Sequence, residues 1–165
     1  MGEDATLRGA ASRTTVDLLL TGKDTGGRLL LIRSLERRGC EPPRHRNEDE
    51  IVYVLDGELT YYLGGREHRA RTGSCLFLPK GGEHGFAVET QEAHLLTLVL
   101  PAGLEGYYLE LDEARREDDV TVERLVTVAA RYGVEITGPP VRTAQRTTAA
   151  SKVDRASKPG RRKRT

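Results

Sequence analysis

Short apolar runs separated by glycine-rich turns fill the chain from about residue 16 to residue 100. Runs of about four to eight residues with alternating side chains predict β-strands, and many short strands at this spacing predict an all-β sandwich or barrel. Asp56-Gly57 between two of the runs suits a tight hairpin turn, because glycine accepts positive φ without steric cost. The eight expected strands are 16–20, 28–34, 51–55, 58–63, 66–70, 74–78, 84–89 and 93–100.

The pattern changes from period two to a helical period after Pro101. Residues 104–113 predict one helix, and a second is indicated where Val122, Leu125, Val126, Ala129 and Ala130 recur on one face. Gly133 stands where a helix usually ends. We therefore expect a helical extension at about 103–133, packed by its apolar face on the outside of the barrel.

Composition and charge divide the chain into one domain and two tails. With 165 residues, of which 37% are hydrophobic, the chain has room for one core, expected over residues 13–140. Residues 1–12 are small and polar and predict a flexible terminus. Residues 141–165 hold nine Lys or Arg and one acid, a balance of +8 that leaves the rest at −7 because the total is +1. Few large apolar residues there predict a disordered basic tail.

Several partners and locations are disfavoured by the same composition. No apolar run approaches the length needed to cross a bilayer, and the first residues lack the order of a secretion signal, so a cytoplasmic protein without a membrane partner is expected. The basic tail would attract phosphate, yet it has no interleaved aromatic residues for stacking, so nucleic acid is not the expected partner. Cys40 and Cys75 are interpreted as small packed residues rather than a disulfide.

The candidate chemistry lies in His45, Glu50 and His84. Two imidazoles and one carboxylate are typical of a mononuclear transition-metal site with open positions. Strand alternation places Glu50 on the face of Val52, and His84 on the face of Phe86. We therefore expect the three polar side chains to converge inside the barrel, above a partly apolar pocket lined by Val52, Tyr61, Phe77 and Phe86.

The segment from Gly73 to His84 reads glycine, five residues, proline, one residue, glycine, two residues, histidine. It resembles the second conserved motif of the cupin superfamily, and the first motif is recognisable around Glu50 and Gly57. The resemblance covers roughly residues 15–101. It implies a double-stranded β-helix, the jelly-roll barrel of cupins, and a divalent transition metal (Fe, Ni, Mn, Cu or Zn). The part from residue 107 to 140 is similar to the helical extension of single-domain cupins like bacterial quercetin 2,3-dioxygenases.

The first motif departs from the family pattern, which has two histidines where this chain has one. Asn47 stands at the position of the second family histidine when residues are counted forward from Gly39. Pro43 stands at the position of the first family histidine when residues are counted back from Glu50. We interpret this as the absence of a His-Arg pair between Pro43 and Asn47. The resemblance therefore assigns only His45, Glu50 and His84 as ligands.

Three functions are consistent with these residues. The leading hypothesis is a dioxygenase-like or related metal-dependent enzyme acting on a small oxygenated aromatic or enolic metabolite, with Glu50 as ligand and as general base. The first alternative is a non-catalytic cupin that binds a small molecule. The second is a metal-free isomerase or cyclase that uses Glu50 and His84 as an acid–base pair.

The remaining expectations concern neighbouring groups and the oligomer. His68 is expected at the surface, and His94 in the core or at an edge, with a replacement ligand as the other option. Cys75 is expected as a packed side chain. Cupins commonly pair through their N-terminal strands, and residues 16–20 would otherwise be an exposed apolar edge, so a homodimer is predicted.

Overall fold

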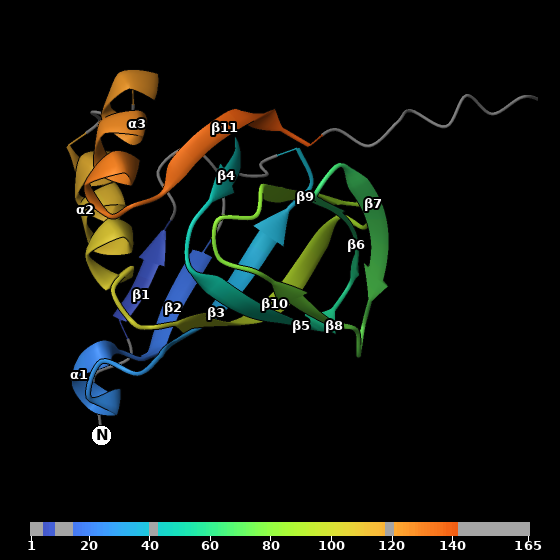
Figure 1. Ribbon diagram of the computed structural model, residues 1–165, viewed down its shortest axis with the longest axis horizontal. Coiled ribbons are helices and arrows are strands. Elements are labelled where there is room, and N and C mark those ends of the chain that lie inside the picture. The colour runs from blue at the N-terminus through green and yellow to red at the C-terminus, as the bar shows by residue number, and fades with distance from the viewer. Residues whose placement is uncertain (1–4, 9–14, 40–42, 118–120, 142–165) are drawn as a thin grey trace, which may run out of the picture.

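The computed structural model describes residues 5–8, 15–39, 43–117 and 121–141, and two antiparallel sheets dominate it (Figure 1). The six-stranded sheet runs in the order β1 (Ala5–Arg8), β2 (Thr15–Leu20), β3 (Leu30–Arg37), β10 (Glu92–Leu100), β5 (Asp49–Asp56), β8 (Cys75–Leu78). The five-stranded sheet runs β11 (Glu135–Pro140), β4 (Pro43–Arg46), β9 (His84–Val88), β6 (Glu58–Leu63), β7 (Arg66–Arg71). The predicted all-β jelly roll is confirmed.

Apolar side chains from both sheets meet between them. Alternation along β5 buries Val52 and Val54 and leaves Tyr53 exposed, as expected for strands with one inner face. This core cluster consists of Val52, Val54, Leu59, Tyr61, Ala70, Leu78, Val88, Ala93 and Leu95. The cluster forms the apolar floor of the barrel.

The β5–β6 hairpin turns at Gly57, where the predicted Asp-Gly pair stands. Gly57 has a φ of 95°, which side chains rarely tolerate. A Cβ at this position would lie 2.8 Å from the Cβ of Ala93, so glycine is required by space as well as by backbone conformation. The turn therefore sets the register of a hairpin whose first strand carries Glu50.

Three helices complete the described fold: α1 (Gly22–Thr25), α2 (Glu105–Arg116) and α3 (Val122–Arg131). The longer helices, α2 and α3, lie side by side next to β1, and β11 leads from them back across β4 (Figure 1). A second core cluster forms under the helices from Val16, Leu18, Leu30, Ile32, Val99, Leu104, Ala129 and Val134. None of these described helices combines the length and apolar character needed to cross a membrane.

The structure corrects the N-terminal expectation. Residues 5–8, placed in the flexible terminus 1–12, form β1 and pair with β2 in antiparallel register from Ala5–Leu18 to Arg8–Thr15. Strand β2 is therefore not an edge, and the reason for pairing two chains through it no longer holds. The homodimer stays a prediction. The rest of the proposed flexible terminus, and the proposed disordered tail from residue 142 onward, lie outside the described residues.

Two further strands, β4 and β11, were not expected from the sequence. β11 follows the helical extension and pairs with β4 from Glu135–Arg46 to Pro140–Pro43, with irregular register. The sequence of β4, Pro-Arg-His-Arg, has no alternation of apolar and polar residues that would predict a strand. Its partners on both sides supply the hydrogen bonds that make it one.

Candidate metal centre

His45 and His84 face each other across neighbouring strands of the five-stranded sheet. They are directly opposite in the antiparallel β4–β9 pair. Their rings lie 4.5 Å apart between centroids, with an interplanar angle of 65°. Cross-strand pairing thus brings together two imidazoles that are far apart in sequence.

Glu50 reaches the same place from the opposite sheet. It lies on β5 between Leu78 and Val99 of the neighbouring strands, and is only 8% exposed. One potential ligand atom each from His45, Glu50 and His84 lies within 4.8 Å of the other two. Two atoms bound to one ion at about 2.1 Å are at most about 4.2 Å apart, so small side-chain movements suffice for a common ion. The expected convergence of these residues is therefore observed.

The two ring nitrogens of His84 have different surroundings. Nδ1 lies 2.9 Å from the carbonyl oxygen of Gly82, so Nδ1 carries the proton and donates it there. Nε2 is buried and has no hydrogen-bond partner among the described residues. A histidine held at one nitrogen by a carbonyl, with the lone pair of the other aimed into the site, is the usual arrangement of a metal ligand.

Burial keeps the His84 imidazole neutral. Desolvation lowers the pKa of His84 below its ordinary value, and the neighbouring His45 lowers it further. The carboxylate of Glu50 and the Gly82 carbonyl act in the opposite direction, and the lowering prevails. Metal binding requires an unprotonated nitrogen, so this environment favours a ligand at neutral pH.

Asn47 completes the polar surroundings of Glu50. Asn47 is 8% exposed, and its Nδ2 donates a hydrogen bond to Oε1 of Glu50. Its backbone carbonyl accepts a bond of 2.9 Å from the N–H of Gly81, in the loop before His84. Asn47 was one of the two residues considered for the position of the missing histidine, and it does lie beside the site.

The pocket predicted below the ligands is partly corrected. Val52 and Tyr61 are buried, and the ring of Phe86 lies 5.4 Å from that of Tyr61, so these three residues line the interior as expected. Phe77 is 58% exposed, and its assignment to the pocket is wrong. Phe77 lies on β8 and pairs with Ile51 of β5, so it is one residue out of phase with Leu78, the buried residue of β8 that points inward.

A second buried carboxylate, Glu36, was not identified from the sequence. β3 continues past its apolar half to Arg37, and alternation after Leu30, Ile32 and Ser34 turns Glu36 inward. Burial raises the pKa of Tyr61 and of Tyr108 well above the ordinary value, and the charges of Glu50 and Glu36 raise both further. The alternation of inward and outward residues continues along β3 beyond its apolar part, and following it to position 36 would have identified Glu36 from the sequence.

The other candidate ligands lie elsewhere. His68 is exposed, as expected. His94 has a side chain 42% exposed and lies 4.0 Å from Glu92, so it does not replace the missing ligand. Cys75 is exposed, and its prediction as a packed side chain is wrong. Cys40 lies outside the described residues.

Comparisons with known proteins agree with this fold. The family model of the cupin domain matches residues 35–100. Acetate kinase EutQ of Clostridioides difficile is 45% identical over 42 residues, which are 26% of this chain and 27% of that protein. Quercetin 2,3-dioxygenase of Bacillus subtilis is 24% identical over 109 residues, 59% of this chain and 32% of that protein. The chain thus spans about a third or less of the length of these curated relatives.

This chain is also similar to a protein of known structure. The polyketide cyclase RemF from Streptomyces resistomycificus superposes with a TM-score of 0.52 and 25% identity, covering 59% of this chain and 74% of that one. The residues that match the cupin-domain model, 35–100, include β4, β5, β8 and β9, which carry or flank the three candidate ligands. The protein described here is therefore a cupin-domain protein, with its cupin domain over residues 35–100.

Proposed function

We propose that His45, Glu50 and His84 hold a divalent transition metal and that the protein is a metal-dependent enzyme, dioxygenase-like or related, acting on a small oxygenated aromatic or enolic molecule. The observation that carries this proposal is the convergence of the three ligand atoms within 4.8 Å, with the buried Nε2 of His84 left unpaired among the described residues. Two imidazoles and a carboxylate suit Fe, Ni, Mn, Cu or Zn.

The residues around the site have separable roles. A bound metal would act as a Lewis acid toward a substrate oxygen. Glu50, bonded to Asn47 through Oε1, keeps a second carboxylate oxygen that can ligate or accept a proton from an enol or phenol. Tyr61 stays protonated because burial raises its pKa, so its hydroxyl remains a hydrogen-bond donor up to alkaline pH.

The interior favours a flat, partly apolar substrate. Val52, Tyr61 and Phe86 present aliphatic and aromatic surface below the polar ligands. Such surface would exclude water and would suit an aromatic ring whose oxygens point toward the site. The likeness to quercetin 2,3-dioxygenase, whose name gives an aromatic substrate, supports the same class.

The likeness to a polyketide cyclase favours a second candidate. The structure of RemF matches at 25% identity over 59% of this chain. A cyclisation or isomerisation moves protons without consuming oxygen, and Glu50 as base with neutral His84 as its partner would suffice. The apolar interior serves this reaction equally well.

One set of measurements separates the candidates. Protein stripped with a chelator is reloaded with each of the five metals, and metal content, turnover of quercetin and oxygen uptake are recorded. The dioxygenase proposal expects turnover with oxygen uptake that one metal restores. Turnover insensitive to the chelator, without oxygen uptake, would support the cyclase. Stabilisation by quercetin without turnover would support a binding protein, and no metal bound at micromolar supply would overturn the metal centre.

A further inference from the structure

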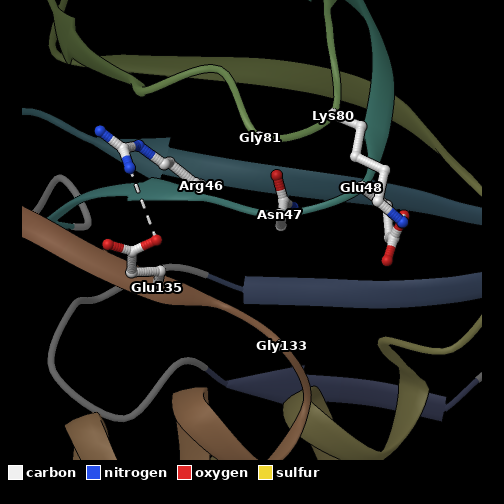
Figure 2. A pocket seen from close by; sticks show the side chains of 7 residues that line it. All are labelled: Arg46, Asn47, Glu48, Lys80, Gly81, Gly133 and Glu135. Atoms are coloured by element: carbon white, nitrogen blue, oxygen red, sulfur yellow. Dashed lines mark ion pairs between the residues drawn. The ribbon is translucent and has the colours of Figure 1, made fainter.

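A polar pocket lies beside the candidate metal centre, outside the apolar interior. Its volume is about 270 Å³. It opens between the end of β4, the loop that precedes β9 and the segment that enters β11 (Figure 2). The lining residues are Arg46, Asn47, Glu48, Lys80, Gly81, Gly133 and Glu135. This volume is at the small end for ligand sites, so the pocket suits a small molecule or one end of a larger one.

Asn47 connects the pocket to the metal centre. A carboxylate group can accept hydrogen bonds but cannot donate them. The amide nitrogen of Asn47, which is the donor, is therefore assigned as the atom that faces Glu50. The amide oxygen Oδ1 therefore points the other way. Oδ1 is buried, as expected in a residue that is only 8% exposed, and it has no hydrogen-bond partner among the described residues. A buried carbonyl oxygen without a donor is rare in folded proteins and indicates a missing partner.

The adjacent residue presents the complementary group. Nε of Arg46 is buried and likewise has no partner within the described part of the chain. The other end of this guanidinium is engaged, because Nη1 lies 3.6 Å from Oε2 of Glu135. Two consecutive residues thus line one pocket with an unpaired acceptor and an unpaired donor.

The charges around the pocket are balanced. Arg46 pairs with Glu135, and Nζ of Lys80 lies 2.5 Å from Oε2 of Glu48. Figure 2 shows Asn47 between these two pairs, with Gly81 and Gly133 on the two sides. A Cβ added at either glycine would meet no atom within 4 Å, so both leave open space at the pocket. Recognition by hydrogen bonds is therefore favoured over recognition of a large net charge.

We infer that this pocket binds a small molecule in which a hydroxyl group stands next to a carbonyl or carboxylate group. The hydroxyl donates to Oδ1 of Asn47, and the carbonyl or carboxylate oxygen accepts from Nε of Arg46. Such a ligand satisfies both buried groups together, whereas a ligand with only one of the two functions leaves one unsatisfied. Binding does not require a metal at the centre, so this inference stands or falls independently of the proposed enzyme function.

The probe is glycolate, the smallest molecule with both functions. It is titrated to about 50 mM into metal-free ¹⁵N-labelled protein, enough to detect a millimolar site, while the side-chain signals of Asn47 and Arg46 are followed by NMR. Acetate and ethylene glycol, each with one kind of group, are titrated in parallel. Saturable shifts of both side chains, with glycolate binding at least about tenfold tighter than either control, are expected.

Two variants test the assignment of the groups. Arg46→Lys retains the charge that faces Glu135 but removes Nε, and Asn47→Ala removes Oδ1. Each is expected to weaken glycolate binding at least about tenfold, whereas Arg66→Lys on the exposed face of β7 is expected to have no effect. Unfolding curves confirm that each variant is folded. Absence of saturable glycolate binding, equal binding of the control compounds, or unchanged binding by folded Arg46→Lys would overturn the inference.

Discussion

His45 and His84 occupy opposite positions on neighbouring antiparallel strands, with their ring centroids 4.5 Å apart. A sheet holds such pairs at a nearly constant separation, so the backbone itself orients the two imidazoles. Glu50 approaches from the other sheet. The site is therefore built on rigid strands from both halves of the barrel, which is how a metal centre is best preorganised.

Replacing His84 should strongly weaken metal binding. His84→Ala deletes the buried Nε2 that is unpaired among the described atoms, and we expect affinity for Ni²⁺ or Mn²⁺ to fall at least about 100-fold, since even residues that only orient a ligand are worth about 10- to 100-fold. The matched control is His68→Ala on β7, which removes an exposed imidazole. Calorimetric titration measures both. Equal affinities in the two variants would argue against His84 as a ligand.

A third imidazole at position 47 should strengthen metal binding. Asn47 lies beside Glu50 and is bonded to it through Nδ2, so histidine at this position is within reach of the same ion. We expect Asn47→His to raise the Ni²⁺ affinity at least about tenfold, because imidazole is a better ligand for this ion than an amide. Calorimetric titration against wild type checks it. An affinity that stays the same or falls would show that the side chain at position 47 does not reach the ion.

Leucines on β5 and β6 offer a matched test of the core. Leu59 is 1% exposed and belongs to the cluster between the sheets, whereas Leu55 is 40% exposed. We expect Leu59→Ala to reduce the free energy of unfolding by about 2–5 kcal/mol, since it leaves a cavity. Leu55→Ala should change it by about 0.5 kcal/mol or less. Urea unfolding measures both, and similar losses in the two variants would contradict the assigned faces.

Gly57 should tolerate substitution less well than Gly64, although both have positive φ. Gly57→Ala incurs about 1–2 kcal/mol of backbone strain and adds a clash with Ala93 worth about 1–3 kcal/mol. At Gly64 a Cβ meets nothing within 4 Å, so only the strain is expected. Thermal and urea unfolding compare the two variants. A Gly57→Ala variant as stable as Gly64→Ala would show that the close approach to Ala93 relaxes freely.

Stability should fall at alkaline pH because buried phenols resist ionisation. Burial raises the pKa of Tyr107 from its ordinary value of 10 to about 12, and burial also raises the pKa of Tyr61 well above that ordinary value. Above about pH 10 the unfolded chain releases these protons first, so the folded state binds more of them and stability decreases as pH rises. Each such phenol contributes about 1.4 kcal/mol per pH unit between the two pKa values.

Urea unfolding at about pH 9, 10 and 11 measures this dependence, and absorbance at alkaline pH reports the phenolates. Tyr61→Phe removes one of the phenols and should flatten the slope. A free energy of unfolding that is constant over this pH range would contradict the burial of these hydroxyl groups.

Much of the fold follows from local pattern. The strand from Glu58 to Leu63 was expected at its observed limits, because alternation on both sides of Asp56-Gly57 determines a hairpin. The inward faces of Glu50 and His84 followed from the same alternation. Phe77 was assigned to the wrong face because a four-residue strand carries too little pattern to set its phase.

The sequence by itself determined the classes of element, the turn at Gly57 and the identity of the three candidate ligands, because period-two alternation and glycine turns are local properties. Only the tertiary structure decided that Pro43–Arg46 is a strand, that His45 stands opposite His84 and that Asn47 is bonded to Glu50. The first two of these features depend on pairing with β9 and β11, strands that follow β4 by about 40 residues or more. Such long-range partners produce no periodic pattern in the segment that they stabilise.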